Sequence, residues 1–230
     1  MKRTGAVVLC LALLSAVGAV FVGIMESGAA DVYLKATRPD FQKMPIGVLD
    51  FPADNDARWS GMRVAEILKA DLRRSQIFSV VDLRKFGVTV RHVDLTNRAF
   101  FRQLIDHGVS VLVWGSLGVK EEDVSLDAYV YDGGTDEVVV GKRYVGASTV
   151  VRQMAHRLSD ELVFRYTGEP GVARTKIAYV AEQDGARELY VMDYDGHDPR
   201  QVTADGFLNL MPQWSPDRRF LVFTSYRSRG

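Results

Sequence analysis

A repeated pattern of short strands limits the folds that the C-terminal part of this chain can adopt. Ile177–Ala181 and Leu221–Ser225 read as equivalent strands at an offset of 44 residues, and turn residues such as Asp195 and Gly196 separate further short strands between them. A repeat of about 40 to 50 residues built from short strands is typical of one β-propeller blade. Because closed propellers need about four to eight blades, we expect an incomplete propeller over residues 176–230, about one blade plus the first strand of the next. A chance similarity of two strands in another all-β domain is the alternative.

The preceding segment has the mixed pattern of an α/β domain. Apolar runs of strand length alternate with stretches whose apolar residues recur at helical spacing. We expect strands at residues 46–51, 77–81, 109–114, 125–130 and 137–145. We expect helices around residues 64–72, 97–107 and 151–166, the first starting among Asp54, Asn55 and Asp56 and the last capped by Ser148 or Thr149. The pattern predicts an α/β domain with a mixed sheet over residues 31–168, followed by a linker at 169–175 that contains Pro170.

The first thirty residues have the layout of a secretory signal. Lys2 and Arg3 precede an apolar stretch from Ala6 to Met25, and the small residues Ser27–Ala30 follow it. We therefore expect a cleavable signal peptide over residues 1–30 and an exported chain that begins at Asp31. An uncleaved membrane anchor is the alternative, because the apolar stretch is about long enough to span a bilayer.

Cysteine content and charge exclude several classes of protein. Cys10 is the only cysteine, and it follows Val8 and Leu9, where a lipid-modified cysteine needs small residues. The exported chain can then form no disulfide and cannot be a thiol enzyme. Lys plus Arg equals Asp plus Glu at 29 each, so no strong net charge favours nucleic acid or an anionic membrane as a partner.

Residues that could bind a metal do not form a recognised motif. The histidines at 92, 107, 156 and 197 are far apart in sequence, and we expect His156, beside the apolar stripe of the last helix, to be structural or on the surface. Asp193, Asp195 and Asp198 with Gly196 resemble a calcium loop only in part, since the distant glutamate is missing. A hairpin turn, in which aspartates accept bonds from nearby backbone N–H groups, explains them better.

No catalytic motif is found either. The exported chain has no nucleophile elbow, no phosphate-binding loop and no dinucleotide fingerprint. Gly115–Gly118 lack the lysine of a phosphate loop, and Glu121, Glu122 and Asp123 fit a solvated turn. We therefore expect no enzyme, no cofactor and no small-molecule substrate.

Two stretches in the C-terminal part resemble the propeller repeats of the TolB family. They are KIAYVAEQDGARELYVMDYDGHDPRQVT (Lys176–Thr203) and NLMPQWSPDRRFLVFTSYRSRG (Asn209–Gly230), and DVYLKATRPDFQKMPIGVLDF (Asp31–Phe51) is similar to the start of a mature family member. We expect Trp214 and Pro216 to pack between sheets and shape a turn, with a partner-facing tryptophan as the alternative. The chain departs from the family at Arg218, which stands where a turn glycine is usual, so a strained or altered turn is expected. The family's propeller has six blades, whereas this chain has sequence for about one.

The resemblance implies a periplasmic, non-catalytic component of the Tol-Pal envelope system that acts in outer-membrane integrity and in envelope constriction at cell division. It implies two partners: a TolA-like inner-membrane protein and, through a complete propeller, the peptidoglycan-associated lipoprotein Pal. The residues matched to the TolA-linked segment are Asp31, Val32, Tyr33, Leu34, Lys35, Ala36, Thr37 and Arg38. Val32–Leu34 form a short β-prone segment that can add to a sheet edge, although a frayed tail is an equal alternative.

Two other functions stay open at this point. A secreted hydrolase or peptidase could carry a propeller before its catalytic domain, and its nucleophile motif would then follow Gly230. A self-sufficient α/β adaptor with a vestigial tail is the other possibility.

Overall fold

The computed structural model describes residues 42–53, 58–88, 98–120, 123–183 and 185–227. The expected signal peptide, the segment Asp31–Arg38, the helix-start residues Asp54–Asp56, and His92 lie outside this part of the chain. None of the helices in the described ranges combines the length and the apolar character that a bilayer span requires.

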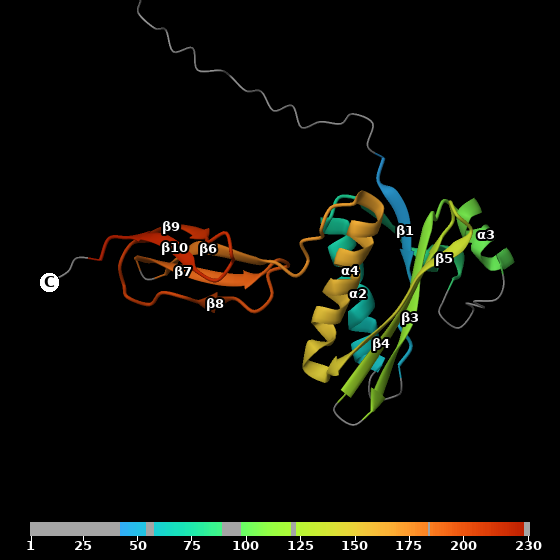
Figure 1. Ribbon diagram of the computed structural model, residues 1–230, viewed down its shortest axis with the longest axis horizontal. Coiled ribbons are helices and arrows are strands. Elements are labelled where there is room, and N and C mark those ends of the chain that lie inside the picture. Colours follow the sequence, from blue (N-terminus) through green and yellow to red (C-terminus); the bar gives the residue numbers. More distant parts are fainter. Residues whose placement is uncertain (1–41, 54–57, 89–97, 121–122, 184, 228–230) are drawn as a thin grey trace, which may run out of the picture. The chain divides into compact units, whose positions relative to one another are not determined.

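A five-stranded mixed sheet is the centre of the described α/β region (Figure 1). Its strands lie in the order β2-β1-β3-β4-β5. β1 pairs in parallel with β2 and β3, whereas β4 pairs antiparallel with β3 and β5. The strands are β1 (Met44–Val48), β2 (Phe78–Val81), β3 (Val111–Lys120), β4 (Asp123–Asp132) and β5 (Glu137–Ala147). The predicted α/β class with a mixed sheet is confirmed.

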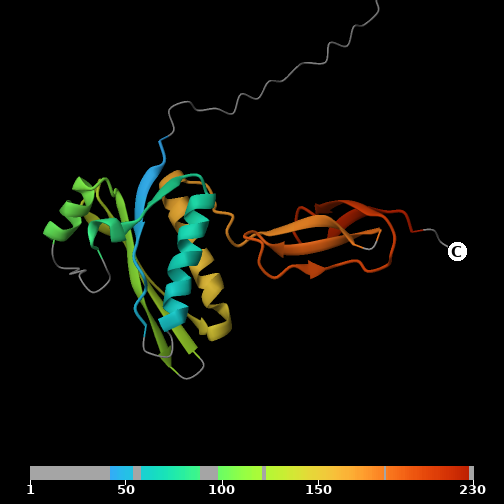
Figure 2. The same ribbon diagram turned by 180° about the vertical axis from the view of Figure 1, so that it is seen from behind.

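Helices α2 (Arg58–Arg74) and α4 (Val151–Thr167) lie side by side on one face of this sheet (Figures 1 and 2). Apolar residues three and four apart on each helix face the sheet, which is the spacing that predicted both helices. The buried residues of this main core include Ile46, Val48, Val64, Leu68, Leu72, Val111, Val113, Leu126, Ala128, Val130, Met154, Ala155, Leu158 and Leu162. The two helices are thus held to the sheet by a continuous apolar layer.

A smaller core covers the opposite face, under α3 (Arg98–Asp106) and the 3-10 helix η2 (Leu83–Phe86). Successive residues of a strand point to opposite faces, so Val111 and Val113 join the main core while Leu112 and Trp114 join the smaller one. The smaller core consists of Leu49, Leu83, Phe101, Leu104, Val109, Leu112, Trp114 and Tyr131. β3 therefore begins as an unbroken apolar run because both of its faces are covered.

Gly115 in β3 lies where the sheet has no room for a side chain. A β-carbon there would overlap the carbonyl oxygen of Asp127 and lie 2.6 Å from Cε1 of Phe51, which is itself buried. Gly115–Gly118 are part of this strand and not a loop. Glycine at 115 allows the close approach of Phe51 and of β4.

The sequence predicted the C-terminal end of α4 correctly but not the cap at its N-terminal end. Ser148–Val150 forms the 3-10 helix η4, and α4 starts after Val150 without any side-chain cap. The expected cap by Ser148 or Thr149 is therefore wrong, because the 3-10 turn separates both residues from the helix start. At the other end Gly168 has φ 75° and its N–H donates to the carbonyl of Phe164, as a glycine at a helix end commonly does.

Beyond residue 175 the described chain forms two open antiparallel sheets. One has the order β6-β7-β8 and the other pairs β10 with β9. The strands are β6 (Lys176–Gln183), β7 (Ala186–Asp193), β8 (Arg200–Gln201), β9 (Asn209–Trp214) and β10 (Leu221–Ser225). Both repeated segments, 177–181 and 221–225, are strands as expected, but the sheets are open and an incomplete propeller is not confirmed.

Glu188, a buried carboxylate on β7, holds the connection from β8 to β9. It accepts hydrogen bonds from the Thr203 hydroxyl at 2.5 Å, from the backbone N–H of Gly206 at 2.7 Å and from the side-chain amide of Asn209 at 3.1 Å. These bonds lower the pKa of Glu188 below its ordinary value, the Thr203 bond most, against an opposing effect of burial. One side chain thus helps to fix a connection that otherwise pairs with β7 through the isolated bridge between Arg187 and Leu208.

The turn between β9 and β10 shows both a confirmed and a wrong prediction. Arg218 has φ 61°, so an arginine occupies the left-handed conformation that favours glycine, as its place in the sequence predicted. Trp214 at the end of β9 is 40% exposed. Its expected packing between sheets is wrong for this chain, because the β9–β10 sheet is open.

Candidate functional site

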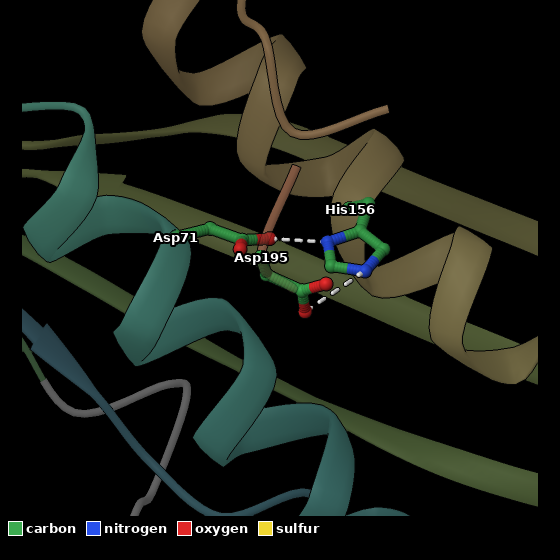
Figure 3. Close-up of side chains that lie close together, drawn as sticks. All are labelled: Asp71, His156 and Asp195. Atoms are coloured by element: carbon green, nitrogen blue, oxygen red, sulfur yellow. Dashed lines mark hydrogen bonds and ion pairs between the residues drawn. The ribbon is translucent and has the colours of Figure 1, made fainter. Parts of the chain in front are cut away.

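A cluster of charged side chains is buried where α2, α4 and the turn after β7 meet. Figure 3 shows Asp71 from α2, His156 from α4 and Asp195 from the turn, with each ring nitrogen joined by a dashed line to one of the two carboxylates. The contact of α2 with α4 is otherwise apolar, so charged groups at this depth need partners.

Asp71 and His156 join the two helices directly. Nδ1 of His156 lies 2.6 Å from Oδ2 of Asp71, and the side chains are 5% and 1% exposed, respectively. This distance is that of a strong hydrogen bond between a ring N–H and a carboxylate. The pair orients the ring, since Nδ1 must carry the donated proton.

Asp195 faces the other nitrogen of the ring. Its Oδ2 lies 3.8 Å from Nε2 of His156. Its Oδ1 accepts the backbone N–H of His197 at 3.2 Å, and the N–H of Gly196 donates to the carbonyl of Asp193 at 2.8 Å. The expected aspartate-stabilised turn is confirmed, and the turn leaves Oδ2 directed at α4.

Two arginines complete the cluster. Arg152, one helical turn before His156 on α4, forms an ion pair with Oδ2 of Asp195. Arg74, one turn after Asp71 on α2 and partly exposed, has Nη1 at 3.6 Å from Oδ1 of Asp71. Each carboxylate therefore has one arginine and one nitrogen of the same imidazole ring.

The protonation state of His156 decides how well the ring suits both carboxylates. A neutral imidazole has one N–H and one lone pair, whereas the protonated ring donates from both nitrogens. With Nδ1–H given to Asp71, the neutral ring directs a lone pair toward Asp195. Nε2 has no hydrogen-bond partner among the described residues, and 3.8 Å is beyond hydrogen-bond range. A small approach of the turn would complete a second bond if the ring is protonated.

The same side chains do not fit a metal centre well. One ligand atom from each of the three lies within 4.8 Å of the others. However, Nδ1 is engaged by Asp71, and Asp195 is already paired with the guanidinium of Arg152. A divalent cation beside a guanidinium is repelled, and a structural zinc site uses four ligands. The described arrangement suits exchange of a proton better than coordination.

A second polar tie holds the segment between the α/β region and β6. Oδ1 of Asp160 on α4 accepts the N–H of Ala173 at 2.7 Å, and its Oδ2 accepts Nε of Arg174 at 2.8 Å. Residues 173 and 174, expected to be linker, are thus fixed to the helix. Asp160 and His156 lie one turn apart on α4.

Sequence reasoning found part of this site. It identified the turn that contains Asp195, and it placed His156 beside the apolar stripe of α4 as a structural or surface residue; the ring is buried. It missed Asp71, Arg152 and Asp160 as partners. His107 and His197 are exposed, and the partner segment Asp31–Arg38 lies outside the described residues, so its role stays a prediction.

Comparison with known families agrees with the sequence resemblance. The model of the family described as the TolB amino-terminal domain matches residues 32–137. A protein named Tol-Pal system protein TolB from Desulfosudis oleivorans is 29% identical over 86% of this chain and 46% of its own length. A protein of the same name from an Anaeromyxobacter species is 33% identical over 83% of this chain and 44% of its own. Residues 32–137 thus match the TolB amino-terminal domain, and the chain is similar to TolB proteins over most of its length.

A solved structure supports the TolB fold. The crystal structure of TolB from Acinetobacter baumannii superposes with a TM-score of 0.67 at 21% identity, and the match covers 81% of this chain and 45% of that one. The chain thus spans less than half the length of these TolB proteins.

Proposed function

We propose that this chain is a non-catalytic component of the Tol-Pal system that binds partner proteins. The observation that carries the proposal is the similarity, over more than four-fifths of the chain, to proteins named for that system. The described polar clusters have structural partners on each side, which is consistent with a binding role. We further propose that the chain serves outer-membrane integrity and envelope constriction at cell division, as the family resemblance implies.

The basic and apolar N-terminus supports a periplasmic location. Its layout is that of a signal peptide over residues 1–30, which would release a chain starting at Asp31. On this proposal residues 31–168 are the α/β domain, 169–175 connect it, and 176–230 belong to a propeller that longer relatives complete.

We assign two partners by their mode of binding. The segment Asp31–Arg38 would bind a TolA-like protein, because Val32 and Leu34 alternate with Tyr33 and Lys35 as in a strand that adds to a sheet edge. A Pal-like lipoprotein would bind a complete propeller. The strands β6 to β10 would then belong to that propeller.

The test is a pull-down from envelope extract of the cognate cell with residues 31–230 as bait. We expect capture of a TolA-like protein and loss of that capture when Asp31–Arg38 are deleted. A matched pair of variants sharpens the result. Val32→Asp combined with Leu34→Asp should abolish capture, because the two introduced carboxylates oppose burial of the strand's apolar face. Lys35→Ala alone should retain most of the capture.

Two results would contradict the proposal. Equal capture by the deletion variant would exclude the N-terminal segment as the site. A folded bait, shown by its circular dichroism, that captures neither partner would exclude a Tol-Pal binding function for this chain.

A further inference from the structure

We propose that His156 is a proton-operated latch that holds the turn 193–197 to helices α2 and α4. This inference rests on the described cluster and is independent of the proposed function. Loss of partner capture in the pull-down would not affect it, and its own test needs no partner.

The proton affects only one side of the ring. The bond of His156 Nδ1 to Asp71, at 2.6 Å and inside the main core, needs an N–H in either charge state. The second proton sits on Nε2, which faces Oδ2 of Asp195. Protonation therefore replaces the lone pair on Nε2, which repels the carboxylate of Asp195, by an N–H that can donate to it. The turn that carries Asp195 is then attracted to the ring.

The charges around the ring favour the same response. The largely buried groups Asp71, Asp195 and Arg152 together carry one net negative charge beside the ring, which, among the described residues, only Arg74 balances while the ring is neutral. Arg74 approaches Asp71 from the exposed end of α2 and is partly solvated. Arg157, which follows His156 on α4, pairs with Glu161, and Asp160, one turn after His156, is engaged by Ala173 and Arg174; His197 on the turn is exposed. The ring is thus the titratable group that sets the charge balance.

The turn is built so that it can move without losing its own shape. Asp195 uses Oδ1 within the turn and only Oδ2 toward α4. The Asp160 tie to Ala173 and Arg174 holds the start of the β region at any pH at which carboxylates and arginines are charged. Release of the latch would therefore loosen the Asp195 side of the turn, while the bond from the N–H of Tyr194 to the carbonyl of Thr175 and the connection at 173–174 stay in place.

The direction of the pH effect follows because the protonated ring of His156 is the form that holds the turn. While both ring nitrogens carry protons the turn is held, and the attachment weakens when the ring loses the proton on Nε2. Arg152 keeps part of the attachment in the neutral state, so we expect a shift between tighter and looser states and not complete release.

Hydrogen exchange of the whole chain, corrected for the pH dependence of intrinsic exchange, tests the latch. We expect the protection of amides 194–198 to fall roughly tenfold between pH 5.5 and pH 8, the size expected for one charge-assisted hydrogen bond. In His156→Gln the protection should no longer change with pH. His197→Gln removes the exposed histidine of the same turn and should keep the full dependence.

Other outcomes decide against the latch. A pH dependence that survives in His156→Gln, or one that is lost in His197→Gln, would overturn it. If His156→Gln does not fold, Asp195→Asn, which leaves the Asp71–His156 pair intact, must abolish the dependence instead. Protection that rises with added zinc chloride and falls with EDTA would replace the proton by a metal ion and also overturn the proposal.

Discussion

The carboxylate of Asp160 accepts the backbone N–H of Ala173 at 2.7 Å, so a helix residue fixes the chain 13 residues further on. The same side chain pairs with Arg174 and is itself buried. Glycine and proline residues predicted a linker over residues 169–175. Residues 173 and 174 of this segment are nevertheless part of the folded structure.

Replacing Asp160 tests the weight of this tie. Asp160→Ala leaves the buried N–H of Ala173 without an acceptor, and we expect a loss of about 2 kcal/mol in unfolding free energy. Urea unfolding followed by circular dichroism measures it. The exposed Glu137→Ala is the control and should change stability by less than about 0.5 kcal/mol. Equal effects of the two variants would show that the tie contributes nothing.

The packing of α4 predicts opposite results for two large apolar residues two positions apart. Leu162 is fully buried in the main core, whereas Phe164 is 58% exposed. Leu162→Ala should cost about 2–5 kcal/mol because it opens a cavity, and Phe164→Ala should cost less than about 1 kcal/mol. Thermal unfolding of both variants checks the orientation of α4; a reversed order would mean that the helix is rotated.

The lowered pKa of Glu188 predicts acid sensitivity of the β region. A carboxyl whose pKa is lower in the folded state stabilises that state at pH values above its ordinary pKa of 4.5. It loses this effect as the pH falls through the lower pKa of the folded state. We expect Glu188→Gln to be less stable than the parent at pH 7 and the difference to vanish near pH 2.5.

Hydrogen exchange of the amides in β7 and β9 at several pH values measures this difference. Glu182→Gln, which removes an exposed carboxylate near the same sheet, is the control and should leave the acid response unchanged. A difference that stays constant down to pH 2.5 would contradict a role for the Glu188 charge.

Arg218 offers a stabilising substitution. Its φ of 61° costs a non-glycine residue about 1–2 kcal/mol. Arg218→Gly removes that strain and adds some freedom to the unfolded chain, so a net gain of about 0.5–1 kcal/mol is expected. The protection of the β10 amides should rise accordingly. The neighbouring Arg219→Gly has no left-handed backbone to relieve and should give no gain; a gain there would point to loss of charge as the cause.

Local sequence patterns predicted the elements well and their long-range contacts poorly. Strand alternation at Leu126, Ala128 and Val130 and helical spacing at Leu158 and Leu162 report directly on the face that is buried, and all five residues lie in the main core. The cap of α4 was mispredicted because Ser148 and Thr149 fit a helix start as well as they fit the 3-10 turn that forms.

The cluster around His156 could not be predicted from local patterns. Asp71 lies 85 residues from His156 in the sequence, and nothing in its helix distinguishes it from a solvated aspartate. Asp195 was correctly placed in a turn, but a turn signal does not tell what its second oxygen contacts. The propeller was expected from a repeat, and a repeat shows which strands are alike without showing whether the sheets close.

The tight packing around Gly115 affects how screens of variant libraries of this chain are interpreted. Every substitution at 115 would push Phe51 and the backbone of β4 away from β3, so the position would score as intolerant in a selection for binding even though its role is in the packing of the sheet. Variants selected for expression alone would show the same intolerance. Comparing the two screens therefore separates positions that are needed for packing of the sheet from positions that are needed for binding a partner protein.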